Sequence, residues 1–217
     1  MTRAIVFDFD GVIANSEPLH LRALQEALAP RGMTVGRREY YARYLGYDDV
    51  GAFRAIGEDR GVTLDDAEIR ALIAAKSVVY QSLLTGDGVL YAGAPACVAR
   101  MAAAFPLGIA SGALRHEIEA ILRAGALDGH FRFIVASGET TAGKPAPDPY
   151  LRAAALHGVD PAECVAIEDS RWGIESARLA GMKTVGITHS YPASELTAAD
   201  AVIDGLDEFT PEFIRAL

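Results

Sequence analysis

Two aspartates, Asp8 and Asp10, stand two residues apart at the end of a short apolar segment near the start of the chain, and Gly11 follows them directly. A buried parallel strand has an apolar sequence of this kind and no structural need for two carboxylates at its exit. A buried charge is costly unless a metal or a charged partner compensates it. The pair therefore predicts a cation, and chemistry, at the carboxyl end of a strand.

Three other groups of polar residues also stand where predicted strands end. They are Ser111 with Gly112, Lys144 in the segment 143–147, and Glu168 with Asp169. Ligands of open α/β sheets bind outside the carboxyl ends of the strands, so we expect all four groups to converge on one crevice. Each group alone has an ordinary explanation as a loop or a helix cap. Their joint occurrence, in chain order and at strand ends, favours a functional site.

The residue types in these groups indicate a metal site with oxygen ligands and phosphoryl chemistry. Several carboxylates without a nearby histidine or cysteine cluster favour Mg²⁺, which usually binds one or two carboxylates together with phosphate oxygens. Ser111 and backbone N–H groups at a helix start can bind a phosphate, and Lys144 adds a positive charge. An aspartate can attack phosphorus and form an aspartyl-phosphate. A second carboxylate two residues on can protonate the leaving oxygen and then deprotonate the attacking water.

The elements that position these groups can be predicted from short apolar segments and helical periodicity. The predicted strands are 4–9, 107–110, 133–136, 164–167, 183–187 and 201–203. From the second strand onward they alternate with helical segments, such as 114–124, which ends at Gly125. We expect Asp148 and Ser170 to cap later helices. This alternation predicts an α/β fold with a doubly wound, Rossmann-like parallel sheet.

Residues before position 90 break this alternation, because helical segments alone follow the first strand. They cover residues 17–30, 37–44, 48–60 and 65–84. The simplest interpretation is an all-helical insert, with residues 1–15 and 87–217 forming the catalytic α/β domain and residues 16–86 forming a helical cap domain. Gly86 and Gly88 stand where the chain returns from the insert, and glycines suit a hinge.

Composition limits the remaining classes of protein. The chain has 217 residues, of which 51% are apolar, and a formal net charge of −9. Such a surface repels phosphate backbones, so we expect no nucleic-acid partner. We see neither a secretory signal nor an apolar segment that could span a membrane. Cys97 and Cys164 are far apart in apolar segments and fit reduced core residues, so we expect a cytoplasmic protein. We also expect a monomer.

At these four groups the sequence resembles the haloacid dehalogenase-like hydrolases. Residues 8–20 and 168–182 look like the branch that holds β-phosphoglucomutases and small phosphatases with a helical cap. The resemblance implies that Asp8 is the nucleophile and Asp10 the general acid and base. It also implies that Mg²⁺ binds Asp8, the backbone carbonyl of Asp10 and Asp169, with help from Glu168. Ser111, Gly112 and Lys144 would bind the phosphoryl group. Asp10 argues against dehalogenase activity, because dehalogenases of this superfamily lack it.

Two residues of the helical insert attract attention as substrate contacts. Lys76 falls in register with apolar residues on the expected buried face of its helix, so it either reaches the edge or points at an anion. The resemblance favours contact with substrate for Lys76, and it makes substrate contact or gating by His20 as reasonable as a structural role. Tyrosines at 40, 41, 44 and 47 either stack on a sugar or, more simply, fill the core of the insert.

One departure from the resemblance bears on the reaction. In β-phosphoglucomutases a Gly-x-Ser-Arg loop binds the second phosphate, whereas this chain has Leu-Gly-Tyr-Asp-Asp at residues 45–49. We therefore favour a Mg²⁺-dependent phosphatase acting on a small phosphorylated metabolite, such as a sugar phosphate or phosphoglycolate. The alternative within the family is a β-phosphoglucomutase-like phosphoryl transferase. A signalling receiver module fits less well, because its phosphorylated aspartate ends the third strand, and a dinucleotide-binding protein lacks support because no G-x-G-x-x-G segment follows a strand.

Overall fold

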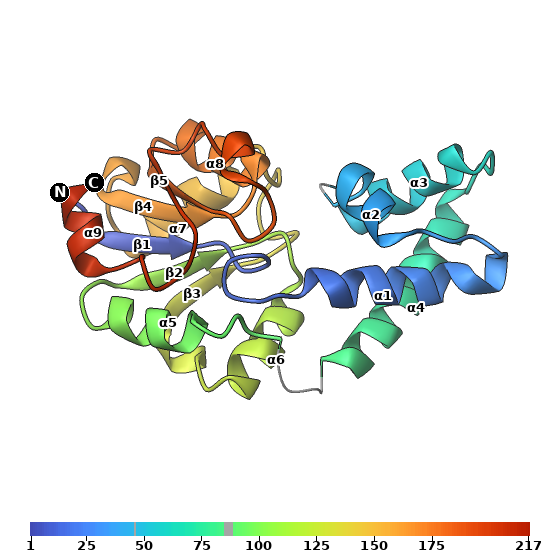
Figure 1. Cartoon of the computed structure of the whole chain (residues 1–217), viewed down its shortest axis with the longest axis horizontal. Coiled ribbons are helices and arrows are strands. Elements are labelled where there is room, and N and C mark those ends of the chain that lie inside the picture. Colours follow the sequence, from blue (N-terminus) through green and yellow to red (C-terminus); the bar gives the residue numbers. More distant parts are fainter. Residues whose placement is uncertain (46, 85–88) are drawn as a thin grey trace. The chain divides into compact units, whose positions relative to one another are not determined.

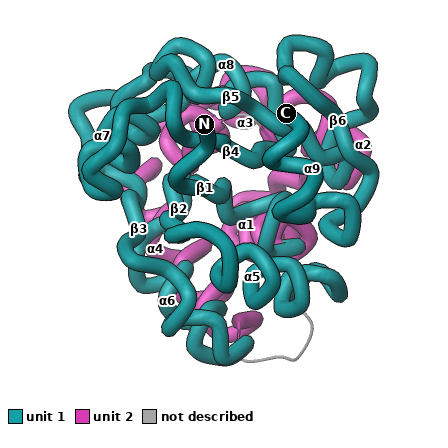
Figure 2. Tube along the Cα trace, turned by 90° about the vertical axis from the view of Figure 1, so that its left-hand side faces the viewer, with its two compact units in different colours: residues 1–15, 88–217 teal, residues 16–87 magenta. Residues whose placement is uncertain are grey.

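The computed structural model describes residues 1–45, 47–84 and 89–217. The chain divides into two compact units, one of residues 1–15 and 88–217 and one of residues 16–87, coloured teal and magenta in Figure 2. Gly46, in the loop where the acidic pair replaces a basic residue, lies outside the described residues, and so do the proposed hinge glycines Gly86 and Gly88. Each unit has its own secondary structure and core.

The first unit contains a six-stranded, fully parallel sheet with strand order β3-β2-β1-β4-β5-β6. The strands are β1 (Ala4–Phe7), β2 (Leu107–Ala110), β3 (Phe131–Val135), β4 (Cys164–Glu168), β5 (Lys183–Ile187) and β6 (Ala201–Ile203). The order changes direction at β1 and β4, as in doubly wound sheets, which confirms the predicted fold class. The two central strands are buried throughout, and this explains why their sequences are continuously apolar.

Helices cover both faces of this sheet (Figure 1). They are α5 (Ala94–Ala102), α6 (Arg115–Ala124), α7 (Asp148–His157), α8 (Arg171–Leu179) and α9 (Pro211–Ala216), with short 3₁₀ helices at Asp128–His130, Pro161–Glu163 and Ala193–Glu195. On one face, Tyr150 and Ala153 of α7 and Ala177 of α8 pack against Val6 and Ala166 of the central strands. On the opposite face, Phe7 makes edge-to-face contacts with Phe131 and Phe209.

Several predicted boundaries need correction in this unit. The first strand ends at Phe7 rather than at residue 9, because the residues after Asp8 close into a hydrogen-bonded turn on the carbonyl of Phe9. Helix α5 has no counterpart among the predicted elements. Ser170 caps α8 as expected, whereas Asp148 is the first residue of α7 and its carboxylate accepts a hydrogen bond from the Ala142 N–H instead.

The second unit is all-helical over its described residues. It contains α1 (Glu17–Leu28), a 3₁₀ turn (Ala29–Arg31), α2 (Arg37–Arg43), α3 (Asp49–Asp59) and α4 (Asp66–Leu83). Its core is made by apolar side chains from all four α-helices, among them Leu24, Tyr44, Phe53 and Leu72. Tyr40 and Tyr44 are part of this core, and Tyr47 is exposed. The structure thus gives Tyr40 and Tyr44 the core-filling role.

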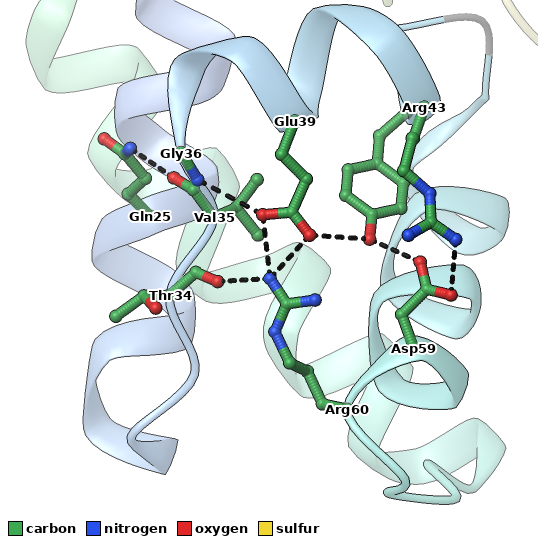
Figure 3. Close-up of polar contacts among 9 residues, drawn as sticks. Gln25, Thr34, Val35, Gly36, Glu39, Arg43, Asp59 and Arg60 are labelled. Atoms are coloured by element: carbon green, nitrogen blue, oxygen red, sulfur yellow. Dashed lines mark hydrogen bonds and ion pairs between the residues drawn. The ribbon is translucent and has the colours of Figure 1, made fainter.

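A polar network ties α2 to α3 inside this unit (Figure 3). Arg60 donates to both carboxylate oxygens of Glu39 at 2.7 and 2.9 Å, and to the backbone carbonyl of Thr34. The Tyr44 hydroxyl donates to Asp59 at 2.5 Å. These contacts fix α2 and α3 relative to each other. In the parts of the chain that the structure describes, no helix is long and apolar enough to cross a membrane.

Candidate active site

The first acidic group sits where β1 leaves the sheet. The Asp8 N–H still donates to the Ile167 carbonyl of β4, at 3.0 Å, and the Asp8 side chain is buried. The chain then turns back, with the Phe9 carbonyl accepting from the N–H of Ala14 at 2.9 Å. Gly11 adopts φ +76° in this turn, a conformation that a side chain disfavours. The turn thus presents Asp8 and the half-buried Asp10 at the carboxyl edge of the sheet.

The second acidic group, Glu168 and Asp169, ends the neighbouring strand. Phe7 of β1 is in register with Ile167 of β4, so the residue after each, Asp8 and Glu168, comes to the same level of the sheet. Ligand oxygens of Asp8, Glu168 and Asp169 lie within 4.8 Å of one another, and all three residues are buried. The pairing of two central strands therefore creates a concentrated, buried negative charge.

Lys144 lies at this cluster, as the sequence predicted. Its Nζ donates to Asp8 Oδ1 at 2.8 Å and to Glu168 Oε1 at 2.5 Å. Burial lowers the pKa of Lys144, but the carboxylates of Asp8 and Glu168 outweigh burial and raise it above its ordinary value. Burial, and then the charge of Glu168, raise the pKa of Asp8 to about 8. Lys144 contacts two of the three carboxyl groups, and a buried set of carboxylate oxygens this close together has the character of a cation site.

Two residues that the sequence did not reveal as part of the site, Tyr150 and Gly173, contact the Glu168 carboxylate or allow its close packing. The buried Tyr150 hydroxyl donates to Glu168 Oε1 at 2.7 Å, and the Tyr150 ring centroid lies 5.0 Å from Lys144 Nζ. A Cβ at Gly173 would lie 1.8 Å from the same oxygen, so only glycine allows α8 to approach this carboxylate. A glycine inside a helical segment is a recognisable sign of close approach, and it could have identified Gly173. No sequence signal separates Tyr150 from an ordinary core tyrosine.

Ser111 and Gly112 follow β2, the strand on the other side of β1. Ser111 is buried, its N–H donates to the Val135 carbonyl, and its Oγ accepts from the Ala113 N–H at 3.0 Å. The space around the Cα of Gly112 is open. Because β1 and β2 are parallel neighbours, Ser111 and Asp8 leave the sheet at the same edge. The Ser111 hydroxyl and the backbone at Gly112 therefore stand at the edge of the sheet where Asp8 also stands.

The residues predicted as substrate contacts in the helical insert lie together within the second unit. Lys76 is buried and makes an ion pair with Asp49. The His20 ring stacks on Tyr80 with 4.1 Å between ring centroids. Burial, and then the positive charge of Lys76, hold the pKa of His20 well below its ordinary value, so this imidazole is neutral at pH 7. The structure therefore gives Lys76 a protein partner, which the sequence did not predict.

Comparison with known proteins gives a consistent result. A family model described as haloacid dehalogenase-like hydrolase matches residues 2–181. Protein CbbY of Rhodobacter capsulatus is 33% identical, covering 99% of this chain and 98% of the relative. Fructose-1-phosphate phosphatase YqaB of Escherichia coli is 32% identical, covering 84% of this chain and 95% of the relative. Among solved structures, a β-phosphoglucomutase from Clostridium difficile has a TM-score of 0.87 with 23% identity, over 100% of this chain and 96% of that one, and shows the same fold.

Proposed function

Since the chain belongs to the haloacid dehalogenase-like hydrolase family, we propose that it is a Mg²⁺-dependent phosphatase that hydrolyses a small phosphorylated metabolite through an aspartyl-phosphate on Asp8. The observation that carries the proposal is the buried cluster of Asp8, Glu168 and Asp169 around Lys144. A purely structural role would not require three buried carboxyl groups at the exit of two central strands. The relative named fructose-1-phosphate phosphatase supports a sugar phosphate as the substrate class, with phosphoglycolate as the other expectation.

The donor set of the cluster fits Mg²⁺. The ligand atoms are all carboxylate oxygens, and the raised pKa of Asp8 reflects burial first and then the charge of Glu168, both of which a divalent cation would offset. Asp8, Asp169 and the backbone carbonyl of Asp10 would hold the ion, with Glu168 assisting. When bound, it would keep Asp8 ionised and withdraw charge from the phosphoryl oxygens.

The residues of this chain then divide the reaction between them. An Asp8 carboxylate oxygen attacks phosphorus while the bond to the leaving oxygen breaks, and that oxygen takes the electron pair and a proton from Asp10. Water next attacks the phosphorus of the aspartyl-phosphate and gives a proton to Asp10. The bond between phosphorus and Asp8 breaks, which releases inorganic phosphate and restores both carboxyl groups. Lys144, Ser111 and the backbone at Gly112 would hold the phosphoryl oxygens through both steps.

Hydrolysis is favoured over a mutase reaction by the contacts at the start of α3. Asp48 caps this helix by accepting from the Gly51 N–H at 2.7 Å, and Asp49 pairs with Lys76. The second unit therefore has two aspartates at the position where a mutase would need a positively charged side chain to bind the second phosphate. The positive charge of Lys76 is already paired with Asp49. We propose that Lys76 and His20 contact the uncharged part of the substrate rather than a second phosphate.

A phosphatase screen tests this proposal. Purified protein is incubated with sugar phosphates, phosphoglycolate and hexose 1-phosphates, with Mg²⁺ or with a chelator, and free phosphate and isomerised sugar are both measured. We expect phosphate release that requires Mg²⁺ and disappears in Asp8→Asn. Asp128→Asn is the matched control, because it changes an exposed aspartate in the 3₁₀ helix before β3. This variant should keep its activity. Isomerisation of a hexose 1-phosphate with catalytic bisphosphate and little free phosphate would instead establish a mutase.

A further inference from the structure

His189 lies two residues after β5 and reaches the turn that carries Asp10. Its Nδ1 is 2.8 Å from the backbone carbonyl oxygen of Gly11. A carbonyl oxygen only accepts, so Nδ1 carries the proton in this contact and donates it. His189 takes no part in the reaction steps above, yet its ring contacts the residue immediately after the proposed general acid.

The ring of His189 is itself held in place. It stacks on Tyr91 with ring centroids 3.9 Å apart and an angle of 23° between the planes. The Tyr91 N–H donates to the Ile13 carbonyl at 3.0 Å, within the same turn. Tyr91 and His189 thus form a clamp that grips the turn at two backbone carbonyls, those of Ile13 and Gly11. A side chain fixed by both a stack and a hydrogen bond has little rotational freedom left to lose.

Gly11 is the point at which such a clamp matters. It has φ +76°, and a glycine there has a wide range of accessible conformations unless its surroundings restrict it. Asp169 and Ser190 restrict one side, because a Cβ at Gly11 would lie 1.7 Å from Asp169 Oδ2 and 2.8 Å from Ser190 Oγ. The hydrogen bond from His189 restricts the carbonyl. Together these contacts restrict the backbone on the carboxyl side of the preceding residue, Asp10.

We propose that His189 is a positioning residue that orients Asp10 for proton transfer by holding the Gly11 carbonyl. The proposal rests on the phosphatase function proposed above and adds a determinant of its acid step. It has a specific consequence. Asp10 protonates the leaving oxygen, so an error in its position should slow esters whose leaving group needs a proton. It should have little effect on the first step, phosphoryl transfer to Asp8, for esters whose leaving group departs readily as an anion.

The test compares two substrates in three forms of the full-length protein. His189→Phe keeps an aromatic ring to stack on Tyr91 and removes the donor. His189→Asn restores an N–H near the position of Nδ1. The substrates are an alkyl phosphate from the metabolite screen and p-nitrophenyl phosphate, whose leaving group needs no proton. We compare kcat/KM, which reports phosphoryl transfer to Asp8 and not the later hydrolysis step that both esters share. We expect His189→Phe to lower kcat/KM for the alkyl ester about 10- to 100-fold and kcat/KM for the aryl ester less than about 3-fold, and His189→Asn to recover most of the loss.

A second histidine, far from the Gly11 carbonyl in the sheet, provides a matched control. His130→Phe changes a histidine at the amino end of β3, on the opposite edge of the sheet, and should leave both rates unchanged. Equal loss on both esters in His189→Phe, unchanged rates on both, or no recovery in His189→Asn would overturn the proposal. If circular dichroism shows that His189→Phe is unfolded, His189→Leu takes its place with the same expectations. A wild-type protein that hydrolyses neither ester would refute the phosphatase function, and the positioning role with it.

Discussion

Replacing Tyr150 with phenylalanine isolates one hydrogen bond in the acidic cluster. The Tyr150 hydroxyl donates to Glu168 Oε1 at 2.7 Å, and both residues are fully buried, so water does not replace the lost donor. The substitution preserves the ring, and with it the packing of α7 on the sheet. What changes is the number of side-chain donors on a buried carboxylate, which falls from three to two: Lys144 remains at 2.5 Å and Ser170 Oγ at 3.3 Å.

The expected destabilisation follows from this change. A hydrogen bond to a charged group contributes about 1.5–3 kcal/mol, and we expect the lower part of that range because Glu168 Oε1 keeps Lys144 as a donor. With a urea slope of about 2 kcal/mol per M, the unfolding midpoint should fall by about 1 M. Trp172, the only tryptophan of the sequence, lies in α8 of the same unit, so its fluorescence reports unfolding of this unit. The titration is run with a chelator, so that no bound metal compensates Glu168.

An exposed tyrosine provides the control for this measurement. Tyr47 is 56% exposed, and Tyr47→Phe should change the free energy of unfolding by no more than the ~0.5 kcal/mol typical of surface substitutions, which moves the midpoint by about 0.25 M at most. If Tyr150→Phe changed the midpoint no more than Tyr47→Phe does, the hydroxyl would not be an effective donor to Glu168. The account of how the cluster is held together would then be wrong.

Two further predictions concern glycine and pH. A Cβ at Gly11 would collide with the Asp169 carboxylate of the cluster, whereas Gly138 has a similar φ of +78° in open space. Both alanine variants therefore carry backbone strain of about 1–2 kcal/mol, but only Gly11→Ala should abolish phosphatase activity. Equal activity in the two variants would contradict this. Arg60 lowers the pKa of Glu39 below its ordinary 4.5, so their contact stabilises the protein above that pH and the contribution disappears as pH falls through the lowered value. Arg60→Met should therefore lower Tm more at pH 7 than in acid, where only the loss of the Arg60 hydrogen bond to the Thr34 carbonyl remains. A loss of Tm that did not depend on pH would argue against the ion pair.

The sequence was sufficient to predict the sheet and the acidic cluster, because both follow from local patterns. Apolar segments ending in polar residues identified all six strands, and parallel pairing necessarily gathers Asp8, Ser111 and Glu168 at one edge. Helix α5 was missed because it lies just after the residues of the helical insert, where the alternation of strands and helices had not yet begun.

The contacts that hold the site together were beyond local patterns. His189 and Gly11 are 178 positions apart, and Tyr150 reaches Glu168 only because α7 packs on β4's face of the sheet. The partner of Lys76 was also missed, since periodicity placed this residue on a buried face without showing what it would meet there. Such pairs depend on which loops the topology brings together, and a single sequence does not contain that information.

The most direct test of the account is to trap the covalent intermediate. The wild-type protein, with Mg²⁺ and a substrate from the screen, is quenched in acid during turnover, reduced with borohydride and digested for mass spectrometry. Borohydride converts an aspartyl-phosphate to homoserine, and we expect this change at position 8, in the peptide that carries Asp8, and nowhere else. Active turnover that leaves Asp8 unmodified, with the label at another carboxylate or at none, would contradict the central claim that Asp8 attacks phosphorus.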